Sequence, residues 1–169
     1  MKTFLIGFFC GLAAVAAGTG LYFGMGIAPV ATSAPPMPME RYLAHMALHA
    51  RIAKEMPTHV PIPADEANLL AGAHIYREQC AICHGLDGQP QTAISNGMYP
   101  QPPQLFVDGV TDDPPGETYW KAANGIRLTG MPGFKTALSE TQLWQVSLLL
   151  AHADKMPASV KAVVSEPAK

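Results

Sequence analysis

Two cysteines and a histidine stand within five consecutive positions of this chain, in the stretch CAICH (Cys80–His84). This spacing constrains the fold strongly, because two thiols and an imidazole so close together can all reach one bound group. One interpretation of a C-x-x-C pair is a redox dithiol, and another is half of a zinc site. A zinc site needs four ligands, and the remaining cysteine, Cys10, lies in an apolar segment, where it is interpreted as a small filler. A thioredoxin-like dithiol would need a βαβ context, which the flanking sequence does not show.

The histidine that directly follows the second cysteine favours another interpretation. C-x-x-C-H is the attachment signature of a c-type haem. Cys80 and Cys83 would form thioethers with the two vinyl groups on one side of the porphyrin, and His84 would bind the iron from below. The next segment, from Gly85 to Thr118, is rich in proline and glycine and shows little periodicity. So long a loop is typical of a functional segment, here one that wraps a large cofactor. The motif therefore predicts one covalently bound haem c with its iron.

The N-terminal segment carries no charged residue from Thr3 to Ala31. A helix that spans a membrane needs about 20 residues, whereas the apolar part of a signal peptide has about 7–15. Residues 1–31 are therefore interpreted as a membrane anchor, with a long signal peptide as the alternative. Lys2 stands on the short N-terminal flank of this segment, and a basic residue there favours a cytoplasmic N-terminus. We expect the protein in the inner (cytoplasmic) membrane, with its haem domain facing the periplasm.

The rest of the chain divides into three parts by composition. A Pro-rich linker with a short helix at Glu40–Met56 occupies residues 32–63, a compact domain occupies 64–156, and a flexible tail is expected over 157–169. The formal net charge is −2 and no basic run occurs, which argues against a nucleic-acid partner.

Three helices are predicted inside the compact domain, at Ala64–Gln79, Glu117–Gly125 and Leu138–Met156. The last has Ser139 as its N-cap and Gln142 three residues later, the pattern of a capping box. No stretch alternates between apolar and polar residues, so the domain is predicted to be all-α.

Met131 is the candidate for the second axial ligand of the iron. It stands in the stretch GMP, between Gly130 and Pro132, which would hold a non-helical loop, and its thioether sulfur is a soft ligand for haem iron. Met98 is the rival. Met98 lies 14 residues after His84 and Met131 lies 47 residues after it, so the chain up to Met131 has more length to pass around the ring.

These motifs in this order resemble a bacterial class I cytochrome c over about half of the chain, from Ala64 to His152. The shared features are a helix that runs into C-x-x-C-H, a loop with G-M-P-x-F, and a C-terminal helix. The resemblance implies a small all-α fold around one haem, with the first and last helices crossing. Gly72 and Tyr76 match the family's glycine and aromatic on the first helix; the candidates for their apolar partners are Leu143, Trp144 and Val146.

An iron bound by both His84 and Met131 has no open position, so single-electron transfer between redox partner proteins is the predicted function. The chain would be an electron carrier of a respiratory or related chain, with no small-molecule substrate and no enzymatic activity of its own. One alternative is a haem c subunit of a membrane oxidoreductase complex. The other is a haem peroxidase or gas sensor, if the iron site is open.

The remaining polar residues give weaker signals. Arg127, Tyr99 and Trp120 are candidates for contacts with the haem propionates. His45 and His49 have the i, i+4 spacing that can chelate a metal, but two ligands make a poor site, and both are interpreted as ordinary surface residues.

Overall fold

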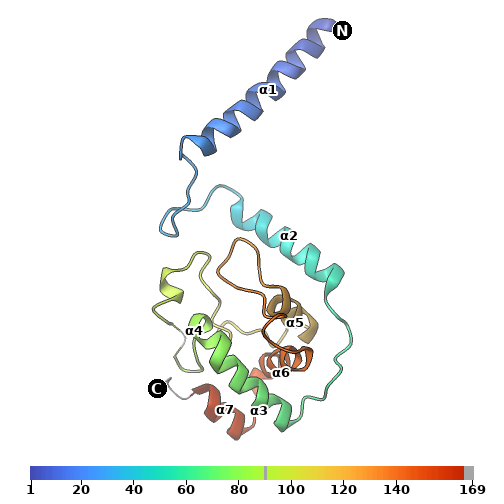
Figure 1. Ribbon diagram of the computed structural model, residues 1–169, viewed down its shortest axis with the longest axis vertical. Coiled ribbons are helices and arrows are strands. Elements are labelled where there is room, and N and C mark those ends of the chain that lie inside the picture. The colour runs from blue at the N-terminus through green and yellow to red at the C-terminus, as the bar shows by residue number, and fades with distance from the viewer. Residues whose placement is uncertain (90, 166–169) are drawn as a thin grey trace. The chain divides into compact units, whose positions relative to one another are not determined.

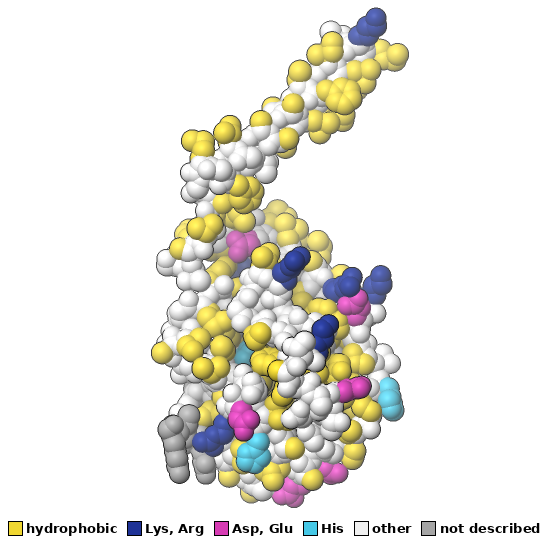
Figure 2. Space-filling view, in the orientation of Figure 1, with side chains coloured by type: hydrophobic (Ala, Val, Ile, Leu, Met, Phe, Trp, Pro, Cys, Tyr) yellow, Lys and Arg dark blue, Asp and Glu magenta, His cyan; other side chains and the backbone are white. Residues whose placement is uncertain are grey.

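The computed structural model describes residues 1–89 and 91–165 of the chain, which divides into two compact units, Met1–Tyr42 and Leu43–Lys169. The first unit contains helix α1 (Lys2–Gly24), whose mean hydropathy over its most apolar window is 2.0. Figure 1 shows α1 as one continuous helix, and Figure 2 shows hydrophobic side chains along its visible side. By length and composition α1 can cross a membrane, although a signal sequence near an N-terminus meets the same criteria.

Helix α2 (Glu40–Glu55) begins in the first unit and lies mostly in the second. Its C-terminal half packs inward through Ile52, which is 2% exposed. The indole Nε1 of Trp120, in α5 (Pro115–Asn124), donates a hydrogen bond of 3.2 Å to Glu55 Oε2 at the end of α2. The second half of the segment predicted as a linker, from Leu43 onward, is therefore part of the second compact unit.

The second unit is built from short helices around the crossing of α3 and α6 (Figure 1). In chain order after α2 they are α3 (Glu66–Ile75), the π-helix η1 (Tyr76–Cys80), α4 (Ala81–His84), the 3₁₀ turn η2 (Ser95–Gly97), α5, α6 (Glu140–Ala151), the 3₁₀ turn η3 (Ala153–Lys155) and α7 (Ala158–Ser165). Within the described residues the one β feature is an isolated bridge between Leu86 and Gln89. The all-α prediction is confirmed.

Helix α3 begins at a capped turn and crosses α6 at a glycine. Asp65 accepts a hydrogen bond of 2.9 Å from Asn68 N, which satisfies one of the free N–H groups at the helix start. A Cβ atom at Gly72 would overlap the carbonyl oxygen of Gln145 and lie 3.2 Å from Leu149 Cβ. Gly72 thus meets α6 most closely at Gln145 and Leu149, and the core cluster brings Tyr76 together with Val146, one of the expected apolar residues.

Helix α6 is the most deeply buried helix of the second unit. The predicted capping box is confirmed: Gln142 N donates to Ser139 Oγ, and Ser139 N donates to Gln142 Oε1 at 2.9 Å. The remaining turns bury most of their side chains, because α3 covers one face and α5 another. The buried side chains include Leu143, Trp144, Val146, Leu148, Leu149 and Leu150.

The segment expected to be a flexible tail contains helix α7, which corrects that prediction for residues 158–165. Val160 and Val164 are both fully buried and join the core cluster that also contains Leu69 and Ala73 of α3. Two valines four residues apart give α7 an apolar face that the α3 surface covers. The last part of the expected tail, 166–169, lies outside the described residues.

Candidate cofactor site

The cysteines and the histidine of CAICH lie at the end of a helical path that starts in the core. The path runs through α3, the π-helix η1 and α4, and ends at Gly85, whose φ of +74° favours glycine. Tyr76, fully buried, donates a hydrogen bond of 2.8 Å to Gly85 O, and its ring packs edge-on against Phe106 with centroids 5.0 Å apart. The end of the path at His84 and Gly85 is therefore tied to the core by Tyr76.

His84 has one ring nitrogen engaged by the protein. Its Nδ1 lies 2.8 Å from the carbonyl oxygen of Pro103, and because a carbonyl can only accept, Nδ1 carries the proton. Burial lowers the pKa of His84, while the hydrogen bond to Pro103 opposes this shift. The neutral imidazole then keeps a lone pair on Nε2, which is the state that binds a metal.

The two cysteines of the motif are free thiols in this structure and form no disulfide. Burial, and secondarily the neighbouring Cys83, raises the pKa of the Cys80 thiol to about 12. Thiol–disulfide exchange proceeds through the thiolate, so this environment disfavours a redox dithiol. In the described part of the chain, no three His, Cys, Asp or Glu residues are grouped so as to hold a metal ion. Neither the zinc interpretation nor a metal at His45 and His49 gains support.

The loop with Met131 is held by local hydrogen bonds. Ile126 N donates to Met131 O at 3.2 Å, and the Thr129 hydroxyl donates to Ile126 O at 2.7 Å. Met131 N donates in turn to Thr129 Oγ1 at 3.1 Å. Leu128, at the tip, has a φ of +62° and is 92% exposed. The result is a compact turn with a half-buried Met131 at its end.

The base of this loop is fixed by two glycines that face each other. Gly125 has a φ of +68°, and a Cβ there would lie 2.6 Å from Gly133 N and 2.8 Å from Met131 O. Phe134 N donates to Ala122 O at 2.9 Å, which fastens the far end of the loop to α5. The close approach needs glycine at both positions, because any side chain would separate the loop from α5.

Two buried polar atoms, Tyr99 Oη and Gln104 Oε1, find no hydrogen-bond partner among the described residues. Buried polar atoms normally have a partner, so each calls for one that the polypeptide does not supply. A phenol O–H is a donor suited to a carboxylate such as a haem propionate. Together with two free thiols and the lone pair on His84, the Tyr99 hydroxyl fits a covalently attached haem.

The three residues proposed for propionate contacts differ in their surroundings. Tyr99 has the buried hydroxyl just described. Trp120 donates its indole N–H to Glu55 instead, and Arg127 is exposed. Of the three, Tyr99 is the one with an unused buried hydrogen-bonding atom.

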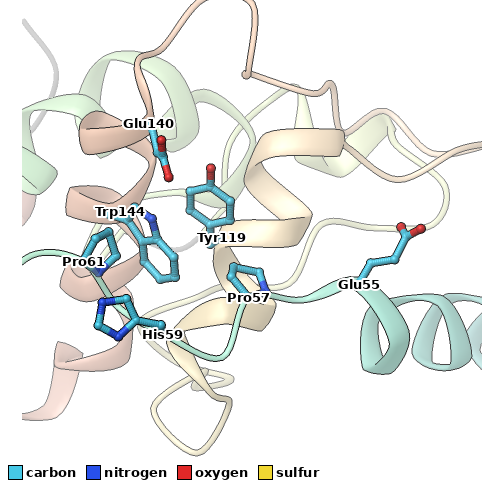
Figure 3. Close-up of a pocket in the computed structure, with 7 residues that line it drawn as sticks. All are labelled: Glu55, Pro57, His59, Pro61, Tyr119, Glu140 and Trp144. Carbon is cyan, nitrogen blue, oxygen red and sulfur yellow. The ribbon is translucent and has the colours of Figure 1, made fainter.

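A pocket of about 320 Å³ is lined by residues of α5, of α6 and of the segment that follows α2 (Figure 3). The rings of Tyr119 and Trp144 stack there with centroids 4.3 Å apart, and the Tyr119 hydroxyl points toward Glu140. Burial, and secondarily Glu140, raises the pKa of Tyr119. Glu55 at the rim is already paired with Arg51 at 2.6 Å. Cys80, Cys83, His84 and Met131 do not line this pocket.

The acceptor for His84, Pro103 O, was not predicted, nor was the unpaired Oε1 atom of Gln104. Both lie in YPQPPQL, where prolines lack an N–H and so cannot pair their backbone in a helix or sheet. The carbonyls of such a segment remain available for side-chain donors. A Pro-rich stretch soon after a histidine motif is therefore a signal that could have indicated this contact.

Comparison with known proteins finds a family match within this domain. Residues 67–149 match the family model described as "Cytochrome C oxidase, cbb3-type, subunit III". No curated protein sequence matches the chain significantly. Among solved structures, a chain of the reducing HAO-like protein complex of Kuenenia stuttgartiensis is similar, with 23% identity and a TM-score of 0.51. The match covers 59% of this chain and 49% of that one, so it spans about half of the neighbour's length and concerns the fold alone.

Proposed function

Residues 67–149 make this chain a c-type cytochrome, and from that premise we propose that it holds one covalently attached haem through Cys80, Cys83, His84 and Met131. Its electron-transfer function follows from the cytochrome c domain. The haem supplies one-electron exchange between ferric and ferrous iron. The proposed domain extends beyond the matched residues, over 64–156.

The observation that carries this assignment is the state of His84. A neutral imidazole with Nδ1–H held by Pro103 at 2.8 Å presents Nε2 as a ligand in a fixed orientation. Cys80 and Cys83, four and one positions before it, are both reduced and unpaired. Each thiol would add its S–H across one vinyl double bond, forming one C–S and one C–H bond without net gain or loss of electrons.

Met131 is proposed as the second axial ligand. A thioether favours ferrous iron and so raises the reduction potential relative to a second nitrogen ligand. With both axial positions filled, no substrate reaches the iron, and the chain acts as a carrier rather than an enzyme. The half-buried position of Met131 in a loop with fixed ends supports this role.

We place the chain in the cytoplasmic membrane with the haem domain in the periplasm. The 23-residue apolar helix α1 supports anchoring, and Lys2, its first residue and its one charged residue, supports a cytoplasmic N-terminus. A tether raises the effective concentration of the domain near membrane partners. Its partners would be redox proteins of a respiratory or related chain.

A second candidate is a permanent subunit of a membrane oxidoreductase complex. The observation that favours it is the family description, which names a subunit of a cytochrome oxidase. Purification of the native protein from detergent-solubilised membranes distinguishes the two. Stoichiometric co-purification of an oxidase or dehydrogenase supports the subunit, and recovery as a single chain that reduces several acceptors supports the carrier.

The ligand assignment is tested with carbon monoxide on the haem-loaded full chain. We expect the reduced wild-type protein not to bind carbon monoxide on mixing, because Met131 occupies the position, and the Met131→Ala variant to bind it at once. Immediate binding by the wild type would instead indicate an open iron, as in a peroxidase or gas sensor. An unchanged spectrum in Met131→Ala would show that another residue is the ligand.

A further inference from the structure

The side chain of Met98 bears directly on the loop that contains Met131. A Cβ atom placed on Gly130 would overlap Met98 Cε and lie 3.6 Å from Met98 Sδ. Gly130 directly precedes Met131, and it is not in a left-handed conformation that would itself require glycine. The space that glycine leaves at this position is therefore occupied by the end of Met98.

The backbone of Met98 is in turn connected to the C-x-x-C-H motif. The Thr92 hydroxyl donates a hydrogen bond of 2.7 Å to the carbonyl of Ile82, which stands between the two cysteines. The same oxygen accepts from Ser95 N at 2.9 Å, and Ser95 Oγ accepts from Thr92 N at 2.9 Å. Met98 N then donates to Ser95 O at 3.2 Å.

Ser95 makes this connection rigid. It is 0% exposed, although serine is usually found at the surface, and its hydroxyl also donates to Thr92 O at 3.0 Å. A buried polar residue with its hydrogen bonds satisfied specifies one local conformation, because any other would leave these groups unpaired. The Met98 segment, Thr92–Met98, is therefore a short bracket fixed at one end to the cysteine motif.

From these contacts we propose that Met98 is a positioning residue for the iron ligand Met131. The Met98 segment is hydrogen-bonded to the cysteine motif at one end and contacts Gly130 at the other. It thereby fixes the tip of the Met131 loop relative to the motif. The loop's other end is fastened to α5 through Gly125, Gly133 and Phe134. This inference rests on the proposed ligation of the iron by Met131, which it extends by naming what keeps that ligand in place.

If Met98 positions Met131, loss of the Met98 side chain should increase the fraction of molecules in which Met131 has left the iron. An added ligand such as imidazole binds ferric iron only in molecules from which Met131 has departed, so its apparent affinity measures the departed fraction. Shortening the Met98 side chain removes the contact that restricts movement of the Met131 loop at Gly130. The ferric protein with Met98→Ala should still have Met131 on the iron in the absence of imidazole, but should yield to imidazole more readily.

The test is a spectroscopic titration of the haem-loaded, detergent-solubilised full chain with imidazole. We expect Met98→Ala to raise the apparent affinity about tenfold, the scale of a partly buried side chain lost from a contact. Met98→Leu, which restores apolar bulk without sulfur, should stay within about twofold of wild type. Thr92→Val, which removes the hydroxyl bonded to Ile82, should raise the affinity about threefold. Met46→Ala, a change at an exposed methionine of α2, is the control and should have no effect.

Wild-type imidazole affinity in Met98→Ala overturns the positioning role, as does a rise equal to that of Met46→Ala. The proposed function is checked separately by the long-wavelength charge-transfer band of a sulfur-ligated ferric haem. Loss of this band in Met131→Leu with its retention in Met98→Leu confirms Met131 as the ligand and separates the two roles. Loss in Met98→Leu with retention in Met131→Leu makes Met98 the ligand, and overturns both proposals.

Discussion

The two sides of the candidate site are built in different ways. The side with Cys80–His84 continues a core helix, and Tyr76 ties its end to the buried interior through Gly85. The side with Met131 is a turn whose hydrogen bonds run between residues a few positions apart, such as Ile126 and Thr129. One side is therefore part of the folding core, and the other is a local structure attached to it.

Because of this difference, substitutions on the two sides should have different effects. Damage to α3, the helix that leads into the first side, should unfold the domain, because α3 forms the crossing with α6. Damage to the second side should leave the fold intact and release only Met131, the proposed axial ligand. A protein that must keep its cofactor but tune its potential gains from this division, since Met131, the proposed axial ligand, lies on the side that can change without unfolding.

The largest expected effect comes from the cysteines. Replacing both Cys80 and Cys83 with alanine should abolish covalent attachment, so no haem remains on the chain after denaturing gel electrophoresis and haem staining. Each single variant keeps one possible thioether and should retain some haem. Cys10→Ala, whose residue lies in α1, is the control and should retain all of it. Stain on the double variant would refute covalent attachment through this motif.

The next test breaks the core side at Gly72. Gly72→Ala forces a methyl group into the carbonyl of Gln145, and we expect a loss of about 3 kcal/mol in unfolding free energy, the upper range for overpacking. Gly97→Ala is the matched control, because a Cβ there meets nothing within 4 Å. Denaturant unfolding followed by circular dichroism measures both. Equal midpoints for the two variants would contradict the close crossing of α3 and α6.

The corresponding test of the loop side uses Gly125. Gly125→Ala combines a φ of +68° with overlap onto Gly133, and should cost about 2 kcal/mol of local strain. We expect a weakened sulfur-to-iron band with helix content unchanged. Gly109→Ala shares the positive φ, +73°, but has no atom within 4 Å of the added Cβ. If it weakened the band equally, backbone strain alone rather than loop contact would be responsible.

The smallest expected effect concerns the buried hydroxyl of Tyr99. If it donates to a propionate, Tyr99→Phe leaves that carboxylate more negative, and the reduction potential should fall by about 40 mV, equivalent to one lost hydrogen bond of about 1 kcal/mol. The haem-free chain should be no less stable, because the change removes an unpaired buried atom. Potentiometry on the holoprotein and unfolding of the haem-free form give the two readings. An unchanged potential would mean that Tyr99 has no propionate partner.

Local signals in the sequence predicted much of this architecture. The cap of α6 at Ser139 and the end of α5 at Gly125 depend on nearby residues, and both were found where their sequence patterns indicated. The buried residues Leu69 and Ala73 of α3 and Tyr76 of η1 stand at the spacing of one helix face, a local pattern that the sequence shows. The motif at Cys80–His84 predicted the haem chemistry for the same reason, since all three groups are neighbours in the chain.

Features that depend on distant contacts were not predicted. Helix α7 is short and has weak signals of its own, and its valines Val160 and Val164 are buried by α3, nearly a hundred residues earlier in the chain. The residues of α6 closest to Gly72, Gln145 and Leu149, were not named from the sequence, because the crossing angle decides which turn it meets. The Met98 segment connects Ile82 with the loop at Gly130, and no local pattern indicates these contacts.

The π-helix at Tyr76–Cys80 determines the direction, around the helix axis, in which the side chains of the C-x-x-C-H motif point. Each residue of an α-helix advances about 100° around the axis, so the additional residue of a π-turn rotates everything after it by about that angle relative to what came before. The Gly72 face looks toward α6, and Cys80, Cys83 and His84 are turned away from the direction that an unbroken α-helix would give them. Deleting one residue here, such as Gln79, would keep every side chain of the motif. It would, however, rotate the His84 imidazole by about a quarter-turn around the helix axis, away from its present direction.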